Sequence, residues 1–280
     1  MSSYLELPTY TYEKMTMDEK RLFRRDFEKP VVIRGLYEPE AKKMTMEKII
    51  SMFDDVRLPI EVYKTENTHT CSASVKEYTM EKLFKHWKTN KSPLLYCAEV
   101  DLFEQDVSEK LLKSLHNPKT EQKVIDELLL YLGKNHKTGL HLHVNNDFIL
   151  NQLFGSKTVY IFGNYDNPNI RKNSFFKFSS SNFAVGDFFE MDHSKMKIYK
   201  TILYPGDSLT IPPWCWHATH GHGINMSITE TFLRRDDSYI WKNPNLLLEY
   251  FFEGGPQSLI NVFVVIFILF FVLRCNSTPT

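Results

Sequence analysis

Three histidines have the residue type and spacing of metal ligands. His141 and His143 are separated by a single residue in the run Gly139-Leu140-His141-Leu142-His143. Alternate side chains of a β-strand lie on the same face, so these two imidazoles can bind one metal ion. His217 follows a Pro-Gly-Asp turn, a short apolar run and a Pro-Pro pair, which predict a strand and a rigid bend before it. Neutral imidazoles suit iron, zinc, copper or nickel.

The composition excludes some classes of protein and permits a large core. The chain has 280 residues, of which 42% are hydrophobic and 14% aromatic. Lys+Arg and Asp+Glu balance at 34 each, so no overall basic charge points to nucleic acid. The four cysteines are scattered without a CxxC pair, which argues against a disulfide framework and favours a reducing compartment. The first residues lack the pattern of a signal peptide.

The first part of the chain is typical of a mixed α/β region. Three Thr-Met-acid phrases, at Thr16, Thr45 and Thr79, predict helix starts with threonine as the N-cap. Thr16 and Glu19 have the spacing of a capping box. Short apolar runs predict strands over residues 30–35, 58–63 and 92–97. Leucine spacing predicts a helical stretch over 106–132, interrupted near Pro118.

From about residue 139 the pattern changes to short strands separated by Gly, Asn and Pro turns, which indicates an antiparallel sandwich or barrel. Four segments follow from these patterns. They are an N-terminal α/β region over 1–105, a β core with the metal site over 106–235, a C-terminal segment over 236–257 and a hydrophobic tail over 258–275.

Several motifs together resemble the JmjC-type and cupin-like family of Fe(II)/2-oxoglutarate-dependent hydroxylases. The run from Pro205-Gly-Asp through Ile-Pro to Trp216-His217 is similar to that family's last metal-ligand motif. Gln152-Leu-Phe-Gly155-Ser-Lys157 is similar to its QxxGxK strand pair, and residues 27–35 resemble its N-terminal strand. The resemblance covers roughly residues 20–235. It implies a mainly β double-stranded β-helix (the cupin/JmjC jelly roll). The sequence patterns add an N-terminal α/β region and a C-terminal apolar helix to this fold.

The resemblance also implies ligands and a reaction. His141 and His217 fall at the family's iron-binding histidines, and Lys157 falls where a lysine pairs with the distal carboxylate of 2-oxoglutarate. Thr138 and Tyr96 match positions that hydrogen-bond the same carboxylate in some members. We therefore expect an oxidoreductase, a dioxygenase that uses Fe(II) and the co-substrate 2-oxoglutarate to hydroxylate a protein or RNA substrate.

One departure from the family pattern leaves alternatives open. The carboxylate that usually completes the iron site is replaced by His143, which we expect to be the third ligand. The site could also be that of a three-histidine cupin dioxygenase that does not use 2-oxoglutarate, or Asp147 could supply the carboxylate. A third alternative is a catalytically inactive JmjC-like binding module. A second departure is Phe148, which stands where the family often has asparagine.

The C-terminal tail is almost purely apolar over residues 259–273 and ends at Arg274. A helix of this run would have no polar face, which favours lipid over a protein partner. We therefore expect a transmembrane helix that anchors the protein to the cytosolic face of an intracellular membrane. The alternative is a dimerisation helix in a homodimer of the cytoplasm or nucleus.

Overall fold

The computed structural model describes the parts of the chain that carry the predicted site. The described residues are 4–22, 29–37, 41–54, 56–63, 74–89, 94–105, 107, 110–111, 125–143, 146–163, 166–167, 170 and 183–233. The segment 236–257 and the apolar tail 258–275, with its predicted helix, lie outside these residues. Among the described residues, no helix is long and apolar enough to cross a membrane.

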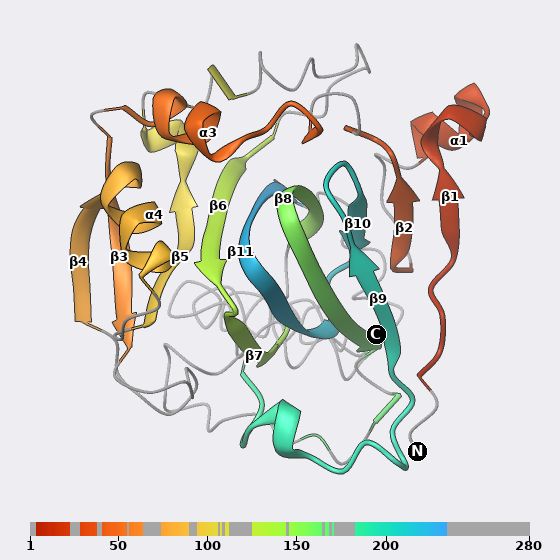
Figure 1. Ribbon diagram of the computed structural model, residues 1–280. Coiled ribbons are helices and arrows are strands. Elements are labelled where there is room, and N and C mark those ends of the chain that lie inside the picture. The colour runs from red at the N-terminus through yellow and green to blue at the C-terminus, as the bar shows by residue number, and fades with distance from the viewer. Residues whose placement is uncertain are drawn as a thin grey trace, which may run out of the picture.

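The protein is mainly β, as the sequence indicates, and its strands form one mixed sheet (Figure 1). The sheet runs in the order β1-β2-β10-β8-β11-β6-β5-β3-β4, with β7 paired to β11 and β9 paired to β8. Only β1 and β2 pair in parallel among the described strands. The strands are β1 (Thr9–Thr11), β2 (Val31–Arg34), β3 (Arg57–Tyr63), β4 (Ser74–Thr79), β5 (Leu94–Asp101), β6 (Glu127–Lys134), β7 (Lys137–His141), β8 (Asn146–Gly163), β9 (Tyr199–Leu203), β10 (Ser208–Ile211) and β11 (Cys215–Leu233).

Short helices begin where the threonine caps predict them. The α-helices are α1 (Met17–Leu22), α3 (Met46–Met52) and α4 (Met80–Lys88), and the 3-10 helices are η1 (Tyr12–Lys14), η2 (Leu102–Glu104) and η3 (Phe188–Glu190). The Thr16 hydroxyl accepts the Glu19 N–H, and the Glu19 carboxylate accepts the Thr16 N–H, which is the predicted capping box. At α3 and α4 the hydroxyls of Thr45 and Thr79 accept the N–H groups of Lys48 and Lys82, which have no carboxylate to return the bond. The local cap chemistry therefore fixes the starts of these helices.

The long strands β8 and β11 form the centre of the sheet and pair along almost their whole length. The first half of β11 pairs with β7 on its other side, and the second half pairs with β6. Both long strands bend at glycines in the left-handed region, Gly155 with φ 65° and Gly223 with φ 61°. A Cβ atom at Gly155 would lie 2.3 Å from the Ile224 carbonyl oxygen. Only glycine fits this close approach of the two paired strands.

The predicted helix over 106–132 is wrong at its C-terminal end, where residues 127–134 form strand β6. The run Leu128-Leu129-Leu130 lies between β5 and β11, and Leu128, Leu130 and Leu132 are fully buried. A short continuous apolar run has the same sequence pattern in a buried strand and in a buried helix. Residues 112–124 lie outside the described part of the chain.

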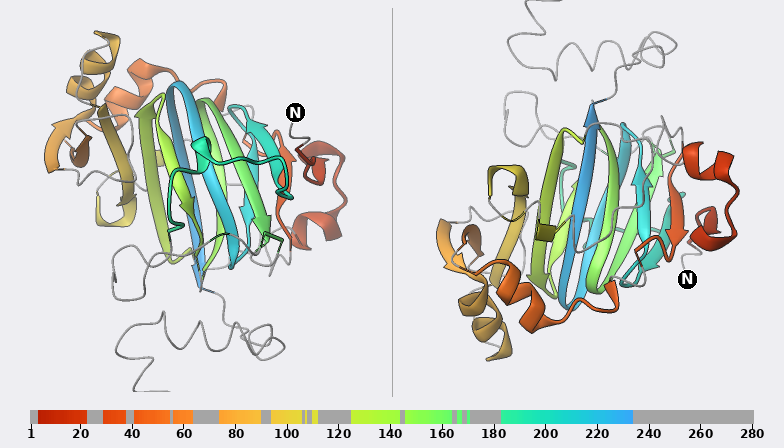
Figure 2. Two further views of the ribbon diagram at one scale, coloured as in Figure 1. Left: turned by 90° about the horizontal axis from the view of Figure 1, so that it is seen from below. Right: turned by 90° about the horizontal axis from the view of Figure 1, so that it is seen from above.

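Two apolar layers cover the sheet from outside. Helices α3 and α4 pack through Ile49, Leu83 and Phe84 in one core with leucines of β6. The segment from Phe183 to Met196 crosses another part of the sheet (teal in Figure 2, left). There Phe188 packs in one cluster with Trp216 of β11. These layers leave the inner surface of the curved sheet free to form a cavity.

Candidate metal centre and adjoining cavity

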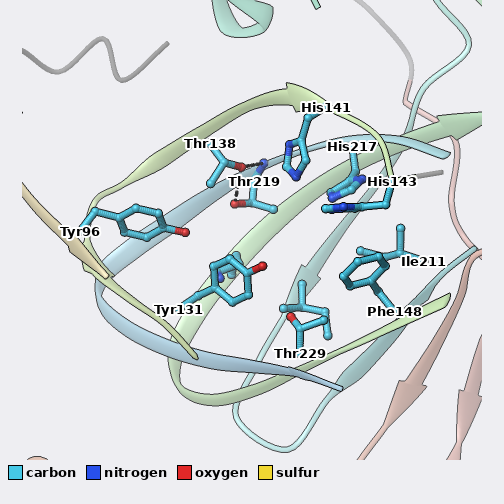
Figure 3. Close-up of a pocket in the computed structure, with 12 residues that line it drawn as sticks. Tyr96, Tyr131, Thr138, His141, His143, Phe148, Ile211, His217, Thr219 and Thr229 are labelled. Carbon is cyan, nitrogen blue, oxygen red and sulfur yellow. Dashed lines mark hydrogen bonds between the residues drawn. The ribbon is translucent and has the colours of Figure 1, made fainter. Parts of the chain in front are cut away.

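The structure brings the three predicted histidines together. The side chains of His141, His143 and His217 each offer a ligand atom, and these atoms lie within 4.8 Å of one another. The ring centroids of His141 and His217 are 4.1 Å apart, because the two residues are direct cross-strand partners in β7 and β11. His143 lies two residues beyond His141, with its ring 5.2 Å from that of His217. All three face the same space (Figure 3).

A β-bulge allows Thr138 to share this space with His141. Thr138 and His141 are three residues apart, so in a regular strand they would point to opposite faces. The pairing of β7 with β11 shifts between His217 and Thr219: His141 pairs with His217, and Thr138 pairs with Thr219. The extra residue on β7 restores the same face for both side chains.

Backbone carbonyls orient two of the imidazoles. The Nδ1 atom of His141 lies 2.8 Å from the Gly139 carbonyl oxygen, and that of His217 lies 3.1 Å from the Cys215 carbonyl oxygen. A carbonyl only accepts hydrogen bonds, so Nδ1 carries the proton and Nε2 keeps its lone pair for a metal. The backbone N–H of Trp214 donates to the backbone carbonyl of His143. Trp214 has φ 65°, which lies in the left-handed region. The residues before β11 thus hold the segment after β7 in place.

The environment of the site favours neutral imidazoles. Burial lowers the pKa of His143 and of His217 well below the ordinary histidine value. The neighbouring histidines act in the same direction, because like charges in contact disfavour protonation. A metal ion needs the unprotonated ring nitrogen. His143 and His217 can therefore bind a metal without first losing a proton at neutral pH.

A small cavity of about 40 Å³ adjoins the histidines. All six residues that the sequence singles out for the metal and the co-substrate line it. The lining residues are Tyr96, Tyr131, Thr138, His141, His143, Phe148, Leu150, Lys157, Ile211, His217, Thr219 and Thr229.

Lys157 is a buried cation in this cavity, with 4% of its surface exposed. Its ammonium donates to the Ser227 hydroxyl at 2.5 Å and lies 5.6 Å from the centre of the Tyr131 ring. Burial lowers the pKa of Lys157 to about 7. Among the described residues, no carboxylate forms a salt bridge with it. The lysine is thus placed to gain a negatively charged partner from a ligand.

Tyr96 reaches the cavity from β5, and residues His136 and Gly133 fix the position of its ring. Its ring stacks on His136, with centroids 3.3 Å apart and planes 12° apart. Gly133 lies directly opposite Tyr96 in the pairing of β5 with β6. A Cβ atom at Gly133 would lie 2.8 Å from the Tyr96 ring, so a larger residue there would displace it. Glycine at 133 and the His136 ring together fix the direction of the phenol.

Thr138, the third residue expected at the co-substrate, already has partners within the protein. Its hydroxyl oxygen accepts the Thr219 N–H at 3.0 Å and lies 2.9 Å from the Thr219 hydroxyl. The hydroxyl pair faces the cavity from β7 and β11 (Figure 3). One of the two hydroxyls can still donate to a ligand while the other donates within the pair.

The alternative in which Asp147 replaces the missing carboxylate is wrong in this structure. Asp147 precedes Phe148 on β8, and alternate side chains of a strand point to opposite faces. Phe148 lines the cavity, with its ring 4.0 Å from that of His143. Asp147 therefore lies on the other face of the strand, and it is not part of the ligand cluster.

Sequence reasoning missed Tyr131, Thr219, Thr229 and His136. Tyr131 belongs to the run that was assigned to a helix, so its face could not be predicted. If residues 127–134 are read as a strand, Tyr131 shares a face with Gly133, next to Tyr96. The threonines of β11 carry no motif and enter the cavity through strand pairing alone.

The donor set fits a first-row transition metal such as Fe(II), Zn(II), Ni(II) or Cu(II), because three neutral imidazoles bind these ions and leave positions open. No family model matches the chain, and a search of curated proteins finds none with significant similarity to it.

Proposed function

We propose that the protein is an Fe(II)- and 2-oxoglutarate-dependent dioxygenase with a double-stranded β-helix of the JmjC/cupin type. In this proposal His141, His143 and His217 hold iron, and Lys157, Tyr96 and Thr138 hold the co-substrate. The substrate that becomes hydroxylated is a protein side chain or an RNA base. The resemblance of the motifs at 152–157 and 205–217 to that family is the sequence basis of the proposal.

One observation carries the proposal: a cluster of three histidines and a buried lysine line the same small cavity. A buried ammonium without an acidic partner is costly, and a carboxylate ligand would offset that cost. A small dicarboxylate can place one carboxylate at Lys157 and its other end at the histidines.

The chain's own residues have separate tasks in this reaction. Lys157 and Tyr96 bind and orient the carboxylate, and the stacked His136 keeps the phenol in position. Phe148, Leu150 and Ile211 form an apolar wall that limits the water near the metal. When bound, iron and 2-oxoglutarate would supply the oxidising chemistry: O₂ would be the oxidant, with one oxygen atom converting the co-substrate to succinate and CO₂ and the other entering the substrate as a hydroxyl group.

A second candidate is a three-histidine dioxygenase that oxidises a small molecule without 2-oxoglutarate. The ligand set favours it, because among the described residues no carboxylate joins the three imidazoles. The small volume of the cavity, about 40 Å³, also favours a compact ligand. In this candidate Lys157 would bind an acidic group of the substrate itself.

An anaerobic titration of the full-length chain separates these functions. Fe(II) is added first and 2-oxoglutarate second, while the visible charge-transfer band of a chelated iron complex is followed. We expect the band in the wild type and in Lys195→Ala, an exposed-lysine control, but not in Lys157→Ala. Iron binding without the band would favour the second candidate. Absence of iron binding would overturn both and leave a catalytically inactive binding module.

A further inference from the structure

Tyr131 lines the cavity, but it is not among the residues proposed to bind the metal or the co-substrate. It lies on β6 directly opposite Ser227 of β11. Ser227 accepts the hydrogen bond of the Lys157 ammonium, and this ammonium lies over the Tyr131 ring. The tyrosine is thus part of the surroundings of the buried cation.

The Tyr131 hydroxyl points into the cavity and not into the core. Figure 3 shows the phenols of Tyr96 and Tyr131 both directed toward the space that the three histidines close on the other side. Neither hydroxyl forms a hydrogen bond with any residue that the structure describes. Tyr96 is 6% exposed, so its hydroxyl has little access to bulk water. Tyr131 is half-buried, and polar groups that face a small cavity in this way are normally satisfied by a ligand or by ordered water.

We infer that Tyr131 is a specificity-determining residue, and that it binds the distal carboxylate of the co-substrate together with Tyr96 and Lys157. This inference rests on the proposed function. The two phenols and the ammonium are all donors, and a carboxylate offers about four lone-pair positions to receive them. A neutral ligand group at this end would leave the ammonium without a negative partner. The site therefore selects a 2-oxo acid that has a second carboxylate.

The protonation of the phenols agrees with this role. Burial raises the pKa of Tyr96 and of Tyr131 well above the ordinary tyrosine value, and nearby glutamates such as Glu99 act in the same direction. Both hydroxyls therefore keep their protons and remain donors at neutral pH. A hydrogen bond from such a donor to a charged acceptor is stronger than one between neutral groups.

The test compares two acids and two proteins. 2-Oxoglutarate carries the distal carboxylate, and 2-oxobutyrate has the same 2-oxo acid end without it. Dissociation constants are measured anaerobically from the charge-transfer band of the iron-loaded, full-length wild type and Tyr131→Phe. We expect the variant to bind 2-oxoglutarate about ten- to a hundredfold more weakly, which is the usual effect of losing a hydrogen bond to a charged group. Its affinity for 2-oxobutyrate should change by less than about twofold, since that acid has no group at Tyr131.

Tyr160→Phe is the matched control, because Tyr160 lies on the same strand as Lys157 and lines a different pocket, with Tyr4 and Phe189. This control should bind both acids like the wild type. Equal weakening of both acids in Tyr131→Phe would show a merely structural role and overturn the inference, as would loss of iron binding before any acid is added. A wild-type band that Tyr131→Phe leaves unchanged would overturn the inference alone. Absence of any band in the wild type would overturn the proposed function and the inference with it.

Discussion

Replacing Lys157 by methionine should make the protein more stable while it removes the anion site. Lys157 is 4% exposed, and burial moves its pKa from 10.5 to about 7. The difference of about 3.5 pH units corresponds to about 5 kcal/mol of destabilisation for the charged form in the folded state. Methionine has a similar length and carries no charge, so the substitution removes this cost.

Part of the gain is offset by what the lysine contributes. The Ser227 hydroxyl loses its hydrogen bond from the ammonium, which costs about 1–3 kcal/mol when the group stays buried. The net stabilisation at pH 6.5 should therefore be roughly 2–4 kcal/mol, from the same two terms. In a chain of this size that corresponds to a rise in Tm of roughly 5–10 °C.

The pH dependence gives a sharper signature than the magnitude. The folded pKa of Lys157 lies below the unfolded one, so between about pH 7 and 10.5 the unfolded chain binds more protons. Wild-type stability should therefore rise with pH across this window through this group, whereas the methionine variant gains nothing from it. The difference between the two proteins should be largest below pH 7 and should shrink toward pH 10. Binding of 2-oxoglutarate to the wild type should weaken over the same rise in pH, because the ammonium is lost.

Urea denaturation of the full-length metal-free proteins at several pH values measures these differences. Lys195→Met, at an exposed position, is the control and should leave stability nearly unchanged. The reasoning is refuted if Lys157→Met is less stable than the wild type at pH 6.5. A difference that stays constant from pH 6.5 to pH 10 would also refute it, because the lysine would then not be the group that titrates.

Two further pairs of substitutions test the close approach of β8 and β11 at Gly155 and the role of His143 as the third ligand. Gly155→Ala should destabilise the protein by several kcal/mol or prevent folding, since its Cβ atom would meet the Ile224 carbonyl at 2.3 Å. Gly223→Ala has the same left-handed backbone but open space, so thermal unfolding should show a loss of only about 1–2 kcal/mol, and equal losses would contradict the steric argument. His143→Asp should retain Fe(II) binding in equilibrium titrations, because it restores the two-histidine, one-carboxylate set, whereas His143→Ala should bind iron at least about tenfold more weakly. Equal iron affinities in the two variants would show that position 143 is not a ligand.

Local patterns in the sequence predicted several features of the fold and of the candidate site. The alternation in 139–143 placed His141 and His143 on one side of the chain, and the threonine caps at 45 and 79 predicted the starts of α3 and α4. These predictions succeeded because each depends on residues a few positions apart. The predicted helix over 127–132 failed because its leucines are buried in the middle of a sheet, which periodicity alone could not reveal.

The sequence by itself determined which residue types could bind a metal, where the threonine-capped helices begin, and the approximate positions of the strands over 30–35, 58–63 and 92–97. Only the tertiary structure decided how these parts meet. Three features depend on the register between strands. They are the bulge that places Thr138 on the same face as His141, the pairing of Tyr131 with Ser227, and the face on which Asp147 lies. Register is fixed by contacts between residues far apart in the chain, and a shift of one residue would turn each side chain to the opposite face.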